Sequence, residues 1–146
     1  MSFQYTLKIS AAGMAAQRQR LNVIASNLAN VTTTRTPEGG PYQRKDIVFR
    51  AAPLLEQDTA SLRNADQPEL LSVETVQVIS DPRPPILKYQ PEHPDADEGG
   101  YVAFPNVNAM EEMVNMLSAS RSYEANLTMM KTAKDMTTKT IDILKV

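Results

Sequence analysis

Proline is absent from both ends of this chain and crowded into its middle. Nine of the ten prolines lie between Pro37 and Pro94, and the last is Pro105. Because proline lacks a backbone donor and interrupts helices, long helices can form only before and after this segment. The sequence therefore predicts an α+β fold, with a long helix at each end packed as a coiled-coil-like pair and a small β-rich insert between them.

The N-terminal stretch has the periodicity of an amphipathic helix. Its apolar positions recur at heptad spacing: Leu7, Met14, Leu21 and Leu28, with Ile24 and Val31 at the intermediate offset. Ser10 and Gln17 occupy the other intermediate positions, so the apolar seam is regular but narrow. We predict a helix from Phe3 to Val31.

A second helix is predicted after Pro105. Asn108 is placed to cap it, and Glu111 follows at capping-box spacing. Its apolar seam comprises one heptad series and a set of partner positions: Met116, Tyr123, Met130, Thr137 and Leu144, then Met113, Leu127 and Ile141. Neither Pro nor Gly occurs after Pro105, so this helix is expected to continue to the C-terminus.

The central segment has the composition of short strands separated by turns. Val, Ile, Tyr and Phe are concentrated in four runs: Tyr42–Phe49, Leu70–Ile79, Ile86–Tyr89 and Tyr101–Phe104. Pro37, Gly39 and Gly40 supply turn chemistry before the first run. The predicted division is residues 1–34 for the N-terminal helix, 35–105 for a loop and the small β-rich insert, and 106–146 for the C-terminal helix.

Two narrow seams form only a marginal helical hairpin. Burying a Leu or Met side chain is worth roughly 1.5 to 3 kcal/mol, whereas ordering each residue costs about 1 to 2 kcal/mol of backbone entropy. We therefore expect the terminal helices to be mobile in the monomer and to become ordered when they pack among other subunits.

Charge and composition exclude several classes of function. The formal net charge is −2 with acids and bases interspersed, so no basic surface is expected for nucleic acid or anionic lipid. Cysteine is absent, which removes disulfides and thiolate chemistry. The first residues lack the pattern of a cleaved signal peptide, and no window predicts a membrane span. By themselves these features indicate a cytoplasmic protein.

No residue pattern predicts a catalytic, cofactor or metal site. His93 is the single histidine, and it lies between prolines in a stretch that does not resemble a nucleophile elbow. Asp95, Asp97 and Glu98 lack the ligand alternation of a calcium loop and indicate a solvated turn. The pair Gly39 and Gly40 is not followed by the Lys and hydroxyl residues of a phosphate loop.

Three long segments resemble the flagellar rod and hook axial protein family. The first comprises residues 18–30, reading RQRLNVIASNLAN, with a core shared by rod and hook proteins, and the following residues 32–49, in which TRTPEGGPY at 34–42 is similar to proximal-rod members. Residues 89–108 and 108–136 also resemble that family, whereas residues 51–79 show nothing distinctive. The resemblance implies a structural subunit of the basal-body proximal rod, the axial drive shaft around the export channel, and not an enzyme.

The resemblance also implies where and with what the chain assembles. It indicates export by the flagellar type III apparatus without a cleaved signal, then assembly in the periplasm with other rod proteins and further copies. The predicted subunit interface comprises the helix seams and two asparagines: Leu7, Met14, Leu21, Ile24, Asn27, Leu28, Asn30, Val31, Met113, Met116, Tyr123, Leu127, Met130, Ile141 and Leu144. We expect Asn27 and Asn30 to hydrogen-bond across helices or to end the first one, since buried Asn needs partners.

Two other functions remain open from the residues alone. A cytoplasmic helical adaptor or export chaperone would also lack a signal peptide. A hydrolase would have to use His93.

Overall fold

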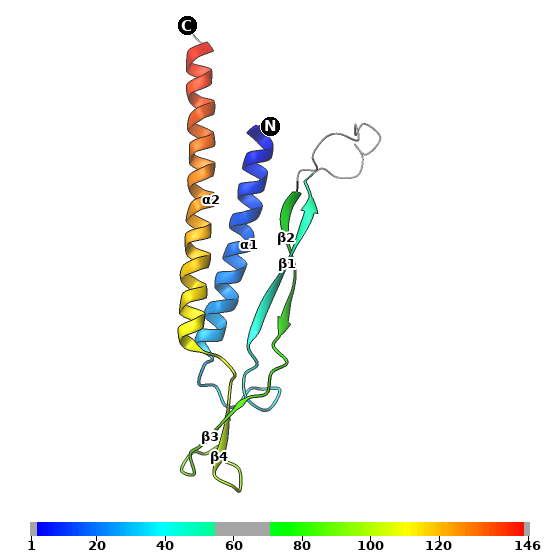
Figure 1. Ribbon diagram of the computed structural model, residues 1–146, viewed down its shortest axis with the longest axis vertical. Helices are drawn as coiled ribbons and strands as arrows, with labels where there is room; N and C mark the ends of the chain where they lie inside the picture. Colours follow the sequence, from blue (N-terminus) through cyan, green and yellow to red (C-terminus); the bar gives the residue numbers. More distant parts are fainter. Residues whose placement is uncertain (1–2, 55–70, 145–146) are drawn as a thin grey trace. The chain divides into compact units, whose positions relative to one another are not determined.

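The computed structural model describes residues 3–54 and 71–144. Its elements follow in the order α1 (Phe3–Ala29), β1 (Lys45–Pro53), β2 (Leu71–Ser80), β3 (Ile86–Tyr89), β4 (Tyr101–Phe104) and α2 (Ala109–Leu144). Figure 1 shows α1 in blue and α2 in yellow to red, formed by the two ends of the chain, and the strands formed by the intervening residues. The predicted α+β class, with two long terminal helices flanking a β-rich insert, is confirmed.

Side chains of the flanking residues define the helix ends. α1 ends at Ala29, two residues before the predicted boundary at Val31. Asn30 closes it, because its backbone N and its Nδ2 both donate to the Ser26 carbonyl, Nδ2 at 2.8 Å. α2 begins at Ala109, and the Asn108 side chain accepts a hydrogen bond from Met110 N at 3.0 Å, as a cap does.

The strands form two separate two-stranded sheets, β1 with β2 and β3 with β4. β3 and β4 are antiparallel, with Ile86 opposite Phe104 and Tyr89 opposite Tyr101, and both have the predicted bounds. β1 begins at Lys45, later than predicted, because Tyr42 N donates to Thr33 O in a loop. The predicted start of the second strand, Leu70, lies outside the described residues.

The chain separates into two compact units, and the division passes through both long helices. The first unit comprises Met1–Arg18, Phe49–Val76 and Ser120–Val146. The second comprises Gln19–Val48 and Gln77–Ala119. Each unit therefore combines part of α1, part of α2 and part of the insert.

Small side chains occupy the buried helix positions of the first unit. Ser10, Ala16 and Ala133 are all less than one-tenth exposed. A Cβ built on Gly13 would lie 2.9 Å from Asn126 Nδ2 and 3.1 Å from Asn126 Cγ, so α1 and α2 approach closely at this point. Such packing brings helix backbones together but removes little apolar surface from water.

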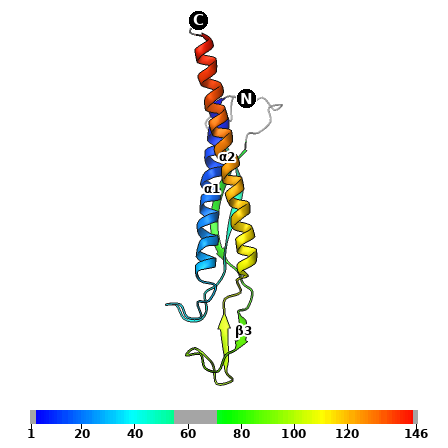
Figure 2. The same ribbon diagram turned by 90° about the vertical axis from the view of Figure 1, so that its left-hand side faces the viewer.

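The second unit has a better-filled interior. Ile24, Tyr42, Val102, Val107 and Ala119 are buried, and Val102 and Ala119 are fully inaccessible. The end of α1 and the start of α2 lie side by side in two perpendicular views (Figure 1 and Figure 2). Two buried polar residues, Asn27 and Glu112, lie on these helix segments and are each 1% exposed.

The glycine turn at residues 36–40 is present as predicted. Thr36 N donates to Gly40 O at 2.9 Å, and Gly39 N donates to Thr36 O at 3.0 Å. Gly39 and Gly40 have φ angles of 92° and 77°, a region that side chains with a Cβ disfavour. This turn reverses the chain between α1 and β1.

We predict that Gly13→Ala lowers the thermal unfolding midpoint, because the added methyl would clash with Asn126. Helix propensity alone would favour alanine by about 1 kcal/mol. A lower unfolding midpoint would therefore be caused by the contact with Asn126. Circular dichroism of the purified chain measures the midpoint. The second substitution Asn126→Ala should reverse the loss, and a Gly13→Ala variant more stable than the parent would contradict the prediction.

Candidate functional site

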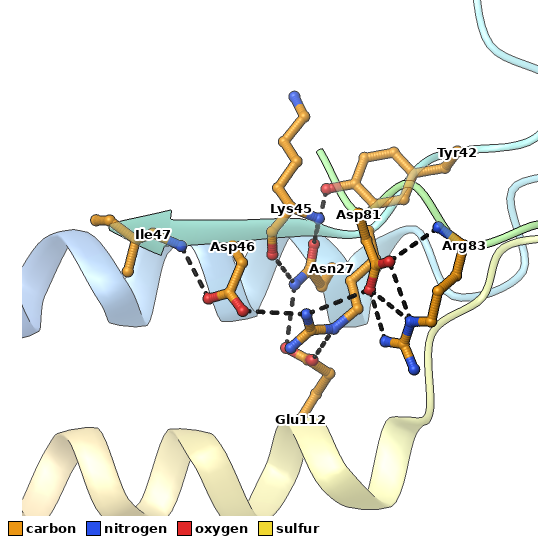
Figure 3. Close-up of polar contacts among 9 residues, drawn as sticks. Asn27, Tyr42, Lys45, Asp46, Ile47, Asp81, Arg83 and Glu112 are labelled. Atoms are coloured by element: carbon orange, nitrogen blue, oxygen red, sulfur yellow. Dashed lines mark hydrogen bonds and ion pairs between the residues drawn. The ribbon is translucent and has the colours of Figure 1, made fainter. Parts of the chain in front are cut away.

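A cluster of polar side chains in the second unit joins α1, α2 and the insert. We call it the polar node, and it comprises Asn27, Tyr42, Arg44, Lys45, Asp46, Asp81, Arg83 and Glu112. Figure 3 shows the side chains of Asn27, Tyr42 and Glu112 pointing toward one another, while Lys45 takes part through its backbone N and O and its side chain points away. Since the node contains the buried polar groups of this unit, it is the candidate functional site.

Asn27 is the centre of the node. Its Nδ2 donates to Lys45 O at 2.8 Å and to Glu112 Oε2 at 3.1 Å. Its Oδ1 accepts from Lys45 N at 2.9 Å and from the Tyr42 hydroxyl at 3.0 Å. An amide side chain offers two N–H donors and two acceptor lone pairs, so the hydrogen-bonding capacity of Asn27 is fully used.

Glu112 brings a buried charge into the node. Its Oε1 accepts from Arg44 Nε at 2.8 Å, while its Oε2 accepts from Asn27. Burial disfavours the charged guanidinium of Arg44, but the hydrogen bonds and charges of Glu112 and Asp46 outweigh this effect and raise the Arg44 pKa above its usual value. Arg44 therefore keeps its positive charge beside the Glu112 carboxylate.

Asp81 attaches the end of β2 to the same cluster. Its backbone N donates to Arg44 O at 2.7 Å, and its carboxylate lies 3.8 Å from Arg44 Nη1. Arg83 Nη2 donates to Asp81 Oδ2 at 2.6 Å. Hydrogen bonds from the Arg83 side chain and backbone lower the pKa of Asp81 to about 2.

The polar node has a structural role. Its buried carboxylate and its buried amide are both engaged with protein partners, so neither is left to activate a nucleophile or to move a proton. A buried charge pair adds little net stability but makes other arrangements costly, because any shift would leave a charge unpaired. The node therefore determines which residues of the two helices and the insert face one another.

The predicted interface residues differ in exposure. Ile24 and Asn27 are buried, Met113 and Ile141 are about half exposed, and the side chain of Leu144 lies outside the described ones. The others are intermediate: Leu7, Met14, Leu21, Leu28, Asn30, Val31, Met116, Tyr123, Leu127 and Met130. Of the two asparagines, Asn27 hydrogen-bonds across the helices and Asn30 ends α1, so each fulfils one of the two expected roles.

Most residues of the node were not predicted from the sequence. The sequence placed Glu111 at capping-box spacing in the first turn of α2, but Glu112 is the buried acid. Asn27 and Glu112 are 85 residues apart, and nothing in the local pattern pairs them. The one usable signal was that Glu112 lies one turn before Met116 and two turns before Ala119, on the side of the helix that faces inward.

The other candidates have structural roles. His93 Nδ1 accepts a hydrogen bond from Asp95 N at 3.1 Å and so closes a turn. Asp95 accepts from the Thr34 hydroxyl at 2.7 Å. Within residues 3–54 and 71–144, no three His, Cys or acidic side chains gather as metal ligands. Over the same residues, no helix combines the length and hydropathy of a membrane span.

Comparison with known families defines the class of protein. A family described as "Flagella basal body rod protein" matches residues 7–35, and "Flagellar basal body rod FlgEFG protein C-terminal" matches residues 98–143. Rod proteins named FlgC from Borreliella burgdorferi and Yersinia enterocolitica are 41% and 42% identical over 96% and 98% of each chain. The chain belongs to the FlgC family of flagellar basal-body rod proteins.

Membership of this family decides between the functions left open above. The FlgC protein of Salmonella typhimurium is also 42% identical, over 92% of each chain. The chain is a structural rod subunit and not an enzyme, as the sequence predicted. The adaptor or chaperone alternative is not favoured.

We predict that Glu112→Gln strongly destabilises the second unit. The amide would place a donor against Asn27 Nδ2 or Arg44 Nε, and it would leave the Arg44 charge without its buried partner. Breaking such a pair costs about 3 to 5 kcal/mol. Urea unfolding measures the loss. Glu111→Gln is the matched control, since the neighbouring exposed carboxylate should contribute less than about 0.5 kcal/mol. Equal effects of the two substitutions would show that the buried interactions of Glu112 do not stabilise the second unit.

Asp81 should make stability depend on pH in the acid range. Its folded pKa of about 2 lies below its usual 3.8, so the contribution is complete above the higher value and lost as pH falls towards the lower one. Unfolding midpoints measured between these two pH values should fall less steeply for Asp81→Asn than for the parent. Parallel profiles would show that the Arg83 interaction is absent in solution.

Proposed function

We propose that this rod subunit belongs to the proximal part of the rod and assembles with other rod proteins and with copies of itself. The interface in this proposal is formed by α1 and α2, including the predicted seam residues. Assembly would take place in the periplasm after export by the flagellar type III apparatus without a cleaved signal peptide. Residues 1–34 and 106–146 would supply the axial helices, and residues 35–105 the insert.

The observation that carries this proposal is the unburied apolar surface of α2. In the first unit, Met129, Met136 and Ile143 recur at heptad spacing and are 55%, 66% and 75% exposed. This is the spacing at which helices pack against one another in coiled coils. Among the described helix residues of this unit, the buried ones have small side chains, so Met129, Met136 and Ile143 are available to a neighbour.

The second unit has a similar surface at the start of α2. Met110, Met113, Val114 and Leu117 follow helical spacing and are each more than half exposed. Contiguous apolar surface of this kind is uncommon on monomers and marks protein interfaces. Burying each of these side chains against a partner would contribute roughly 1.5 to 3 kcal/mol.

Coupled folding and assembly follows from these two surfaces. In the first unit, small-residue packing offers little hydrophobic stabilisation to offset the entropy of ordering the helices. Contact with neighbours would supply the missing burial. Head-to-tail contacts between unlike faces of successive subunits would then extend into a helical tube.

Fractionation of flagellated cells tests the location. A rod subunit should remain with purified basal bodies after membrane solubilisation, whereas an adaptor or chaperone would be recovered in the soluble fraction. Mass spectrometry of the intact chain from those basal bodies would detect removal of a leader. Recovery only in the soluble fraction would contradict the proposal.

Charge substitutions in the seams provide the test at the residue level. Leu28→Asp and Leu127→Asp should abolish rod assembly and swimming while leaving expression intact, because each places a charge where a neighbour's apolar surface would pack. Ala25→Asp and Ala125→Asp are matched controls, since both alanines are exposed on the same helices. Normal motility of the Leu28→Asp and Leu127→Asp strains would exclude these seams as interfaces.

A further inference from the structure

The two faces of the β3–β4 hairpin differ in exposure. Paired residues of an antiparallel sheet share a face, so Lys88 and Val102 lie on one side and Tyr89 and Tyr101 on the other. Val102 is fully buried, so its face is covered at that position, whereas Ile86 and Lys88 on the same face are exposed. On the other face Leu87, Tyr89 and Tyr101 are 64%, 65% and 47% exposed, and we call these residues the hairpin platform.

The hairpin platform is fixed in place although it is exposed. The Tyr89 and Tyr101 rings meet edge to face with centroids 5.4 Å apart. The Tyr89 ring also lies against Gly100, where a Cβ would come within 2.9 Å of Cε2. Gly100 has a φ of 78°, so glycine serves both the turn and the approach of the ring. Rigid, exposed aromatic side chains are typical centres of protein interfaces.

The loop that joins β3 to β4 places negative charge beside the hairpin platform. It directly follows Tyr89 and directly precedes Tyr101, and its acids are Glu92, Asp95, Asp97 and Glu98, all exposed. Tyr101 N donates to Asp97 Oδ1 at 2.8 Å, which fixes the loop against the end of β4. Neither Lys nor Arg occurs between residues 90 and 100.

Aromatic rings next to carboxylates favour a cationic partner. Arginine and lysine side chains stack on aromatic faces and pair with acids at the same time. The described part of the chain already uses such contacts, with Lys88 Nζ lying 4.8 Å from the Phe104 ring centroid. Several of its own cations are occupied, since Arg44, Arg50 and Arg83 each form ion pairs within the chain.

From this juxtaposition we propose that the hairpin platform and its acidic loop bind an arginine- or lysine-bearing surface of an unlike neighbouring subunit. The inference rests on the proposed rod assembly and adds to it a second contact, separate from the helix seams. The platform supplies apolar and aromatic area, and the loop selects a partner of opposite charge.

Site-specific photo-cross-linking in flagellated cells tests this contact. A benzophenone amino acid at position 87 should join the chain to a peptide of a different basal-body protein that contains Arg or Lys. Position 88, which is also exposed but lies on the other face, should not give this product. The joined peptides would be identified by mass spectrometry of purified basal bodies.

Charge reversal distinguishes specific pairing from general proximity. Glu92→Lys combined with Glu98→Lys should reduce the yield at position 87 by about tenfold, because like charges would then face each other. Glu38→Lys is the matched control, an exposed acid in the turn at residues 36–40, and should leave the yield unchanged.

The outcomes separate this inference from the proposed function. Loss of the chain from basal bodies of the parent strain would refute rod assembly itself. A chain that is present in basal bodies would overturn the inference if position 87 gave no product, a product between two copies of the chain, or a product with a peptide lacking Arg and Lys. An unchanged yield in the double charge reversal would also overturn it.

Discussion

The hydrogen bonding of the Asn27 side chain is the constraint on which the second unit depends. Its amide joins α1 to the backbone of Lys45 and to Glu112 of α2, and it has no unused donor or acceptor. Glu112 in turn requires Arg44, whose backbone carbonyl accepts from Asp81. Because the side-chain hydrogen bonds of Asn27 and Glu112 are buried or part-buried, loss of any one of them would leave a polar group without water or protein to replace the lost bond. The cluster therefore fixes one arrangement of these segments.

The two units differ in how they become ordered. The second unit combines a buried polar cluster with a small apolar interior, so much of its structure is determined within the chain. The first unit buries Ser10, Ala16 and Ala133 and leaves larger side chains of α2 in solvent. In the proposed assembly, the second unit would be defined before contact and the first would gain apolar burial from neighbours.

The insert has more than a connecting role. The backbone N and O of Lys45, the first residue of β1, hydrogen-bond with the Asn27 side chain. Asp81, which directly follows β2, lies near Arg44. The β3–β4 hairpin presents aromatic and acidic groups on a face that the chain does not cover. Axial helices and insert thus offer chemically different surfaces, apolar in the first case and aromatic with negative charge in the second. Different neighbours can be recognised by such a pair of surfaces.

The sequence by itself determined the helices, the turns and two of the strands. The signals for these elements act over a few neighbouring positions: proline placement, heptad spacing, and the residues Asn30, Asn108, Gly39 and Gly40. It also carried enough resemblance to identify the rod family. Only the tertiary structure decided which polar side chains are buried together. Asn27, Arg44 and Glu112 meet across 85 residues of chain, and the choice of Glu112 over Glu111 depends on how α2 is rotated against α1. Helix periodicity does not specify that rotation, because the buried positions of α1 and α2 in the second unit include the polar residues Asn27 and Glu112, which an apolar pattern leaves out.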